Sequence, residues 1–351
     1  MKICFVLPRY SRKPIGGFGV IYQYACGLVR DNDVYMLYLN EDIFVNYPLP
    51  RALKKIGGVI MTFFEPRWFG LDKRIRKMTL KTPHLDRIMN EMDTVICTAI
   101  ETVGYVRDLD TSADKAYFIQ DFENWSFPDE YVYESYGLGF KNIVVSSWLK
   151  ELVDEHAKLG SYLVKNPVDT RIYRVKTPVD ERKKHTIALL YHGAAYKGLN
   201  YAFEALDKLK EIYDDIEVKM FGTTVPDRKL PGWIKFTYNA SSEETVSIYN
   251  SVQVFMCATV REGFGLTGLE AMACGDMLVS TDYEGVREYA VNNVNAMLSP
   301  VEDVDALVRN VCLAFDDAWL RKELINEGLK TVSSDFDPED ALKQFTAALK
   351  E

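Results

Sequence analysis

Two glutamates separated by seven residues enclose a glycine-rich turn, and this spacing could bring two carboxylates to one anion-binding site. They are Glu262 and Glu270, in the run REGFGLTGLEAMACG that spans 261–275. Gly263 and Gly265 would let the backbone approach a bound molecule closely. A helical pattern follows, and the free N–H groups and dipole at a helix start bind anions. The pattern therefore predicts a phosphate site flanked by two carboxylates.

The same residues allow a simpler interpretation of the second glutamate. The helix is expected to begin near Thr267 and to end at Gly275, a glycine of the kind that terminates helices. Thr267 and Glu270 have the spacing of a capping box, in which the glutamate only satisfies its own helix start. From these four residues alone, Glu270 is either a ligand-binding carboxylate or a capping residue.

The complete run resembles the signature of the retaining glycosyltransferases of family four, which have the GT-B fold and the pattern E-G-F-G-L-x-x-L-E-A-M-A-x-G. The resemblance implies that Glu262 contacts hydroxyls of the transferred sugar. It also implies that Glu270 binds the ribose of a nucleotide-diphosphate sugar. The implied donor-binding loop, whose backbone holds sugar and phosphate, comprises Gly263, Phe264, Gly265, Leu266 and Thr267.

A second matching run is YHGAAYKGL at 191–199, at the end of a predicted strand. The family usually has an arginine followed five residues later by Lys-Gly. Lys197 matches that lysine and would provide a cation for the donor diphosphate, whose charge grows as the sugar leaves. His192 stands in place of the arginine, and a neutral histidine could donate one hydrogen bond. A solvated lysine and a structural histidine are the alternatives.

Gly16 and Gly17 follow the first predicted strand and precede a helix. Gly17 and Gly19 have the spacing of the first two glycines of a dinucleotide fingerprint, but Tyr22 stands where its third glycine would be. The glycosyltransferases that this chain resembles place a Gly-Gly loop here, facing the donor. A plain tight turn is the alternative.

Three polar residues, Gln120, Asp121 and Glu123, follow another predicted strand. Many relatives have a His-Asp-like pair at this point, close to the sugar. The run QDFE resembles the branch that includes bacterial rhamnosyltransferases and implies an acceptor-side position. A surface loop is the alternative.

Strands must position these residues, and short apolar runs alternate with amphipathic helical patterns along most of the chain. This alternation predicts parallel sheets with right-handed crossovers, whose apolar strands are covered on both faces. We expect an α/β protein with the GT-B fold, in which two doubly wound, Rossmann-like domains face each other across a cleft. Residues 1–165 would form the acceptor-side domain, 166–335 the donor-binding domain, and 336–351 a helix that returns to the first domain. The predicted strands are Ile3–Leu7, Val34–Leu39, Thr94–Thr98, Ala116–Ile119, Ile143–Ser146, Thr186–Tyr191, Glu217–Phe221, Ile234–Phe236, Val252–Ala258 and Met277–Ser280.

A basic segment is hidden by the overall charge. Residues 51–81 contain nine basic and two acidic residues, whereas the chain as a whole has a formal net charge of -9. A helix from Leu71 onward would present cations beside aromatic residues, a composition suited to docking on an anionic membrane. A solvated helix, or a site for an acidic acceptor glycan, is the alternative. The membrane-contact candidates are Trp68, Phe69, Lys73, Arg74, Arg76 and Lys77.

Composition limits the possible classes of protein. A chain of 351 residues with 48% hydrophobic residues can form packed cores, which excludes disorder and collagen. An acidic pI near 5.2 argues against a nucleic-acid partner. His84, His156, His185 and His192 lack metal-ligand spacing, so no metal site is expected. With a first apolar run too short for a signal peptide, we expect a cytoplasmic protein that contacts the inner face of the membrane.

The resemblance implies a retaining transfer from a nucleotide-diphosphate sugar to a hydroxyl of a glycan, lipid-linked or cell-envelope acceptor in polysaccharide biosynthesis. Glu262 and Lys197 would be catalytic in this hexosyl- or deoxyhexosyltransferase, the nucleotide sugar would be a substrate, and no cofactor is expected. The alternatives are a sugar-nucleotide epimerase of the same fold and a non-catalytic carbohydrate-binding relative. A nicotinamide dehydrogenase is disfavoured by the failed glycine fingerprint.

Overall fold

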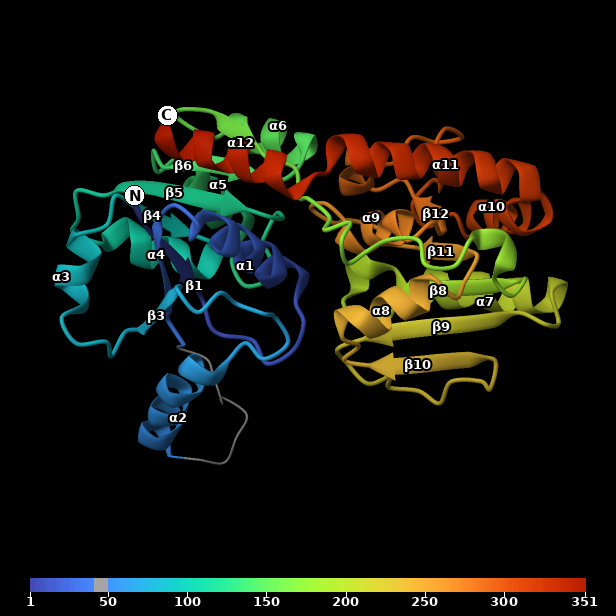
Figure 1. The fold of residues 1–351 in the computed structure, drawn as a ribbon, viewed down its shortest axis with the longest axis horizontal. Coiled ribbons are helices and arrows are strands. Elements are labelled where there is room, and N and C mark those ends of the chain that lie inside the picture. Colours follow the sequence, from blue (N-terminus) through green and yellow to red (C-terminus); the bar gives the residue numbers. More distant parts are fainter. Residues whose placement is uncertain (41–49) are drawn as a thin grey trace. The chain divides into compact units, whose positions relative to one another are not determined.

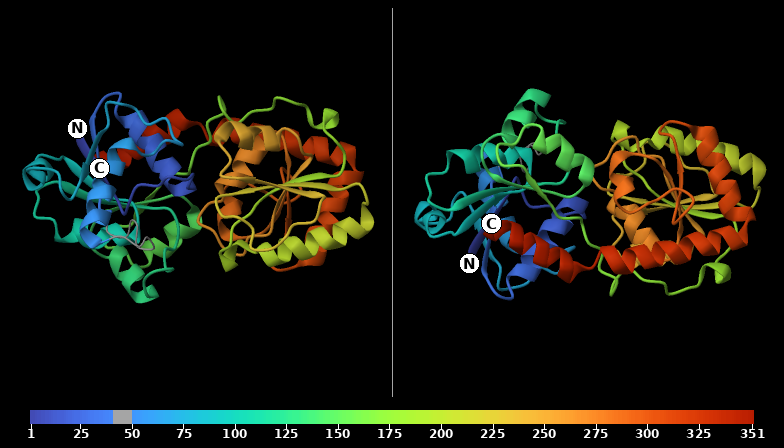
Figure 2. Two further views of the ribbon diagram at one scale, coloured as in Figure 1. Left: turned by 90° about the horizontal axis from the view of Figure 1, so that it is seen from below. Right: turned by 90° about the horizontal axis from the view of Figure 1, so that it is seen from above.

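The computed structural model describes residues 1–40 and 50–351, which form two compact units (Figure 1). Unit 1 comprises Met1–Lys165 and Glu339–Glu351, and unit 2 comprises Asn166–Pro338. In each unit helices cover both faces of a parallel sheet (Figure 2). The boundary between Lys165 and Asn166 coincides with the predicted boundary at 165/166. The boundary between Pro338 and Glu339 lies three residues beyond the predicted boundary at 335/336.

The sheet of unit 1 has the strand order β3-β2-β1-β4-β5-β6-β7, and every neighbouring pair is parallel. The interior strand β1 is almost fully buried, as its run of apolar residues predicts. The strands are β1 (Lys2–Leu7), β2 (Asp33–Tyr38), β3 (Arg76–Thr79), β4 (Thr94–Cys97), β5 (Asp114–Ile119), β6 (Lys141–Val144) and β7 (Ser161–Leu163). The helices are α1 (Gly16–Leu28), α2 (Arg51–Phe64), α3 (Leu85–Asn90), α4 (Ile100–Asp108), α5 (Asp129–Tyr136), α6 (Ser147–Asp154) and α12 (Pro338–Lys350).

The last helix, α12, completes the core of unit 1. Its Phe345 stacks on Tyr24 of α1 with ring centroids 4.4 Å apart, and it meets Phe118 of β5 edge-on at 5.2 Å. A Cβ atom on Gly27 would lie 2.7 Å from Leu342, so the two helices touch where α1 has no side chain. The expected return of the terminal helix to the first domain is therefore present.

The predicted basic helix from Leu71 onward is wrong. Arg76–Thr79 forms strand β3, which pairs with β2 in parallel. Leu71, Ile75 and Met78 have helical spacing, but Ile75 and Met78 are buried beside the sheet edge. Pairing with β2 satisfies the backbone of this segment, and such tertiary contacts override a local pattern of three residues.

The membrane-contact candidates in this segment mostly make contacts within unit 1. Lys77 Nζ donates to the carbonyl oxygens of Phe63 and Glu65, at the end of α2. Arg74 forms an ion pair with Asp72. The remaining contacts are those of the Arg76 guanidinium with the hydroxyl of Tyr35, the Trp68 indole with the carbonyl of Ser11, and the rings of Trp68 and Phe69 with that of Tyr22.

The sheet of unit 2 has the order β10-β9-β8-β11-β12-β13, again entirely parallel. Its strands are β8 (Thr186–Leu190), β9 (Glu217–Gly222), β10 (Ile234–Tyr238), β11 (Val254–Cys257), β12 (Met277–Thr281) and β13 (Met297–Ser299). Its α-helices are α7 (Leu199–Ile212), α8 (Ser242–Tyr249), α9 (Leu266–Ala273), α10 (Val304–Asp316) and α11 (Ala318–Asp335). The short 3₁₀ helices are η1 (Val179–Glu181), η2 (Ala195–Lys197) and η3 (Glu284–Glu288).

All ten predicted strands are present, with ends that differ by one or two residues. The three strands that were not predicted, β3, β7 and β13, have four residues or fewer, too short for a periodic pattern. Among the residues that the structure describes, no helix has both the length and the hydrophobicity of a membrane span.

Candidate active site

The turn between β11 and α9 has the geometry that its glycines predict. Gly265 has φ +93°, a conformation that residues with a side chain rarely adopt. Helix α9 begins at Leu266, and Gly275, with φ +76°, follows its end. Among the described residues, no side chain caps the N-terminus of α9. The expected helix is thus present, and its first turn can serve an anion.

Two buried tyrosines pack against this turn. The Tyr289 hydroxyl donates to the carbonyl of Gly265 at 2.7 Å, and the hydroxyls of Tyr283 and Tyr289 lie 3.2 Å apart. A Cβ atom on Gly265 would lie 2.0 Å from the Tyr283 hydroxyl, and one on Gly285 would lie 2.5 Å from the carbonyl oxygen of Glu262. The segment after β12 therefore fixes the path of the glycine-rich turn.

Lys197 and Glu262 form an ion pair with Nζ 2.5 Å from Oε1, and their side chains are 14% and 23% exposed. Gly198 lets the segment that carries Lys197 come close to the end of β11. It has φ +63°, and a Cβ atom there would lie 1.8 Å from the carbonyl oxygen of Ala258. The pair lines a small cavity together with Thr267. Burial lowers the pKa of Lys197, but the Glu262 carboxylate raises it and the net shift is upward, so the ammonium stays charged.

His192 is neutral and accepts a backbone hydrogen bond. Its Nδ1 lies 3.2 Å from the backbone nitrogen of Ala194, whose N–H donates to it. Burial, followed by the nearby charge of Lys197, lowers the pKa of His192. The single proton of the neutral ring is therefore on Nε2.

Glu270 lies on α9 and is held by tyrosines. The Tyr249 hydroxyl donates to Glu270 Oε2 at 3.3 Å, and the Tyr173 side chain lies close enough to lower the pKa of this carboxylate. Since the N-cap of α9 is Gly265, Thr267 lies inside the helix and the capping box is absent. Burial raises the pKa of Glu270 to about 7, and the hydrogen bonds from Tyr173 and Tyr249 oppose that rise.

In unit 1, the structure brings two of the predicted segments together. Gly16 and Gly17 form the first turn of α1, which has no acidic residue and no side-chain cap among the described residues. The Gln120 amide, at the end of β5, donates to the carbonyl of Gly17 at 3.2 Å. Asp121 accepts the backbone N–H of Phe122 at 2.8 Å.

Glu123 is buried inside unit 1. Its Oε2 accepts the backbone N–H of Ile100 at 2.5 Å, at the start of α4, and lies 3.3 Å from the Tyr117 hydroxyl. Burial raises the pKa of Glu123 to about 8, with smaller contributions from Glu101 and Asp121. A contact between Glu123 and an acceptor remains a prediction, whereas its contact with α4 is a property of the fold.

The sequence did not single out the tyrosines that surround the site, at 173, 249, 283 and 289. Each looks like an ordinary apolar residue in its local run, because hydroxyl positions depend on contacts between distant segments. A weak signal existed for Tyr283 and Tyr289, since both lie within four residues of Gly285. The described residues contain no cluster of three or more histidine, cysteine or acidic side chains that could hold a metal ion.

Part of unit 2 is similar to a known protein family. Residues 171–331 match the family model for glycosyl transferases group 1. The capsular polysaccharide biosynthesis glycosyltransferase CapM of Staphylococcus aureus is 29% identical over 93 residues, which are 26% of this chain and 24% of that protein. The phosphatidyl-myo-inositol mannosyltransferase of Mycolicibacterium smegmatis is 26% identical over 132 residues, 36% of this chain and 34% of that protein. The matched part is thus about a quarter to a third of these curated relatives.

A solved structure matches the chain over its length. The crystal structure of Anabaena HepE in complex with UDP and glucose has a TM-score of 0.77 at 15% identity, covering 100% of this chain and 99% of that chain. At this identity the likeness concerns the fold, which is the GT-B fold with its two parallel-sheet α/β domains. Residues 171–331, which contain the Lys197–Glu262 pair and the turn before α9, thus form a glycosyl transferases group 1 domain.

Proposed function

We propose that this protein is a retaining glycosyltransferase that moves a sugar from a nucleotide-diphosphate sugar to a hydroxyl of an acceptor. The observation that carries the proposal is the Lys197–Glu262 ion pair beside the start of α9. The cation, the carboxylate and the N-terminus of α9 lie at the carboxyl ends of β8 and β11. Parallel α/β sheets bind ligands at these ends of their strands.

The charges of unit 2 suit a leaving diphosphate. A bound diphosphate would compete with Glu262 for the ammonium of Lys197, and the first turn of α9 would donate to its oxygens. His192 would add one hydrogen bond from Nε2 without adding charge. Glu262, released from the lysine, would accept hydroxyls of the transferred sugar.

In the proposed reaction, the acceptor oxygen forms a bond to the anomeric carbon while the bond from that carbon to the diphosphate oxygen breaks. The acceptor proton passes to the leaving phosphate oxygen on the same face of the sugar, so the anomeric configuration is retained. This route needs no protein base, and the protein contributes mainly electrostatic stabilisation.

The acceptor is proposed to be a glycan or a lipid-linked sugar. Two relatives support this, since CapM acts in capsular polysaccharide biosynthesis and the Mycolicibacterium enzyme is a phosphatidyl-myo-inositol mannosyltransferase. Gln120 and Asp121 remain the acceptor-side candidates in unit 1. Within that unit they lie beside Gly17, at the end of β5.

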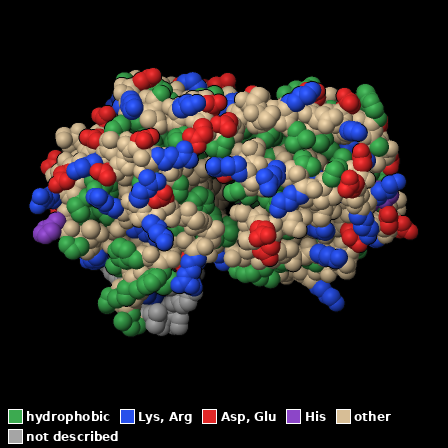
Figure 3. Space-filling model, viewed as in Figure 1, with side chains coloured by type: hydrophobic (Ala, Val, Ile, Leu, Met, Phe, Trp, Pro, Cys, Tyr) green, Lys and Arg blue, Asp and Glu red, His purple; other side chains and the backbone are tan. Residues whose placement is uncertain are grey.

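Contact with the inner, anionic face of a membrane is also part of the proposal, through α2 rather than through 71–81. Five large apolar side chains of α2 are each more than half exposed, and Figure 3 shows apolar atoms gathered over this helix. Residues 51–64 contain three basic and no acidic residues. This combination suits an interfacial helix. The exposed side chains are Leu53, Ile56, Ile60, Phe63 and Phe64.

Flotation with vesicles tests this contact. Wild-type protein is expected to float with vesicles that contain anionic lipid and to be released by salt, whereas Phe63→Ser/Phe64→Ser should stay unbound. Trp319→Ser is the matched control, because Trp319 is an exposed aromatic residue of unit 2. Equal flotation of all three proteins, or none with wild type, would refute the membrane contact.

The transfer itself is tested with a panel of UDP, GDP, ADP and dTDP sugars, screened by thermal shift and followed by an assay for donor turnover. An epimerase would convert the donor sugar without releasing nucleoside diphosphate, and a carbohydrate-binding relative would show a shift without turnover. Release of nucleoside diphosphate together with a glycosylated acceptor is the expected result.

A further inference from the structure

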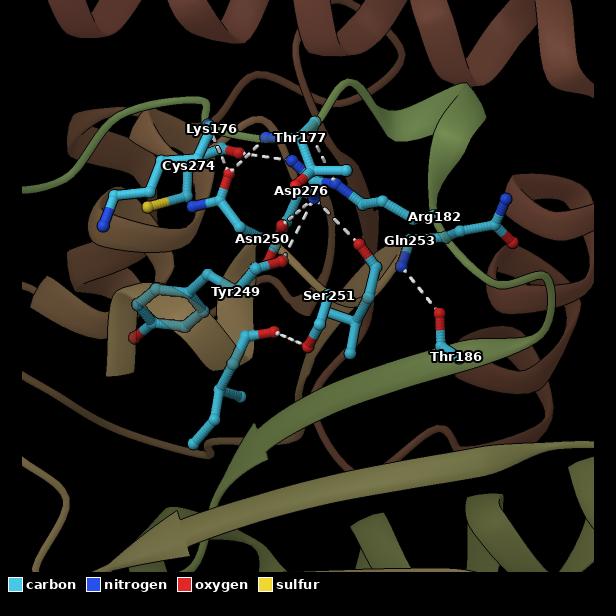
Figure 4. Close-up of polar contacts among 12 residues, drawn as sticks. Lys176, Thr177, Arg182, Thr186, Tyr249, Asn250, Ser251, Gln253, Cys274 and Asp276 are labelled. Atoms are coloured by element: carbon cyan, nitrogen blue, oxygen red, sulfur yellow. Dashed lines mark hydrogen bonds and ion pairs between the residues drawn. The ribbon is translucent and has the colours of Figure 1, made fainter. Parts of the chain in front are cut away.

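A segment outside the signature motifs is pinned to the donor-binding unit. This strap, Tyr173–Thr177, runs past the end of α8 (Figure 4). Asn250 Oδ1 accepts the backbone N–H groups of Lys176 at 2.5 Å and Thr177 at 3.1 Å. Its Nδ2 donates to the carbonyl of Arg174 at 3.1 Å. One side chain thus holds three backbone groups of the strap.

A buried arginine ties the strap to the ends of two helices. Arg182 and Asp276 form an ion pair at 2.5 Å, and both side chains are completely buried. The Arg182 guanidinium also donates to the carbonyl oxygens of Thr177 at 2.9 Å, Tyr249 at 3.1 Å and Cys274 at 2.6 Å. The strap, the end of α8 and the end of α9 are therefore fixed by one group (Figure 4).

These three elements meet at the carboxylate of Glu270. The strap contributes the hydroxyl of Tyr173, and the last residue of α8 contributes the hydroxyl of Tyr249. The Tyr249 hydroxyl is also 3.3 Å from the carbonyl oxygen of Thr267, in the first turn of α9. The thiol of Cys274 and the phenol of Tyr289 also lie close enough to sense the charge of Glu270.

We propose, resting on the proposed function, that Tyr173 and Tyr249 are positioning residues that hold the Glu270 carboxylate ready for the ribose hydroxyls of the donor nucleotide. A carboxylate has about four acceptor sites. Donation from both tyrosine hydroxyls would leave two sites for the two ribose hydroxyls. The strap and Arg182 matter because they keep Tyr173 and Tyr249 on the same carboxylate.

The position of the two tyrosines has a consequence for proton binding. Among the described residues, the groups that oppose the effect of burial on the pKa of Glu270 are Tyr173 and Tyr249. Removing either hydroxyl takes away a hydrogen bond to the charged form, so the pKa of Glu270 rises further. A rise of about one unit corresponds to a tenfold change in the proton equilibrium.

The experiment follows the side-chain carboxyl carbon of Glu270 by ¹³C NMR during a pH titration of the full chain without ligand. Glu270→Gln assigns the resonance. The expected midpoint is near pH 7 for wild type and about one unit higher for Tyr173→Phe and Tyr249→Phe. Tyr213→Phe is the matched control, because its hydroxyl bonds to Asp316 elsewhere in unit 2. Midpoints that do not differ among the tyrosine variants would overturn the proposal.

Asn250→Ala tests the strap. It should move the midpoint in the same direction as Tyr173→Phe, and the double variant should shift it by less than the sum of both. Additive shifts would overturn the role of the strap.

Donor binding provides the second measurement, with UDP as the probe. For Tyr173→Phe and Tyr249→Phe, the dissociation constant at pH 7 should rise several-fold and its pH dependence should follow the NMR midpoint, whereas Tyr213→Phe should match wild type. A parallel weakening at every pH would indicate a merely structural role and overturn the proposal. If UDP, GDP, ADP and dTDP all fail to bind wild type, the proposed function fails, and the titration without ligand still decides the role of the tyrosines.

Discussion

Breaking the Lys197–Glu262 pair from either side should destabilise unit 2, and breaking it from both sides should restore most of the stability but none of the activity. The side chains are 14% and 23% exposed, so each charge is largely removed from water. Removing one partner of a buried pair leaves the other charge uncompensated and costs about 3–5 kcal/mol. Because both groups keep some solvent contact, we expect about 3 kcal/mol for Lys197→Met and for Glu262→Gln.

In the double variant no charge is left without a partner. Its loss of stability should be about 1 kcal/mol, which gives a coupling energy of several kcal/mol, well above the error of a double-mutant cycle. For a domain of this size, 1 kcal/mol corresponds to roughly 2–4 °C in Tm. Each single variant should therefore melt about 6–12 °C lower than wild type.

The assay combines thermal unfolding with donor turnover. Lys183 and Glu217 provide the control pair, since they have the same 2.5 Å separation but side chains that are 54% and 34% exposed. An exposed pair contributes about 0–1 kcal/mol, so Lys183→Met/Glu217→Gln should show little coupling and normal turnover. Coupling below about 0.5 kcal/mol at Lys197–Glu262, or turnover in the double variant, would show that the pair is neither a buried ion pair of this strength nor needed for turnover.

Three further perturbations have distinct expected outcomes. Glu123 has a folded pKa of about 8 against its ordinary 4.5, so its contribution to stability is present below pH 4.5 and is lost as the pH rises through 8. Urea unfolding between pH 4 and 9 should show a loss of roughly 5 kcal/mol that Glu123→Gln lacks, and identical profiles would contradict it. Gly265→Ala forces a side chain to φ +93° and against the Tyr283 hydroxyl, which should lower Tm and weaken nucleotide binding. Tyr283→Phe should relieve part of this loss. A Gly265→Ala variant that binds nucleotide like wild type would contradict the close contact between Tyr283 and this turn. Arg182→Leu leaves Asp276 buried without its partner and should cost about 3–5 kcal/mol in chemical denaturation, so an unchanged midpoint would contradict the tie that Arg182 provides.

The sequence was sufficient for most of the fold because apolar strand patterns and amphipathic helix patterns alternate along the chain. Apolar runs of three to seven residues identified ten strands, and their alternation with helical patterns implied two parallel sheets. The segment 71–79 failed because Leu71, Ile75 and Met78 mimic a helix over three residues. Only the neighbouring strand β2, which is distant in the chain, decides that this segment is extended.

The site was predictable where chemistry depends on local spacing. The glycine turn, the start of α9 and the carboxylates at 262 and 270 all fall in one run of fifteen residues. Contacts across the chain could not be derived in this way. The pairing of Lys197 with Glu262 and the tyrosines around Glu270 depend on how β8, β11 and the strap pack, which composition and periodicity do not specify.

The central claim is that Glu262, paired with Lys197, is required for glycosyl transfer. The most direct measurement is the turnover of the donor selected by the nucleotide-sugar panel, compared between wild type and Glu262→Ala at a temperature where both are folded. Wild type should transfer the sugar, and Glu262→Ala should remain folded but show no transfer. Transfer by Glu262→Ala at the wild-type rate would contradict it.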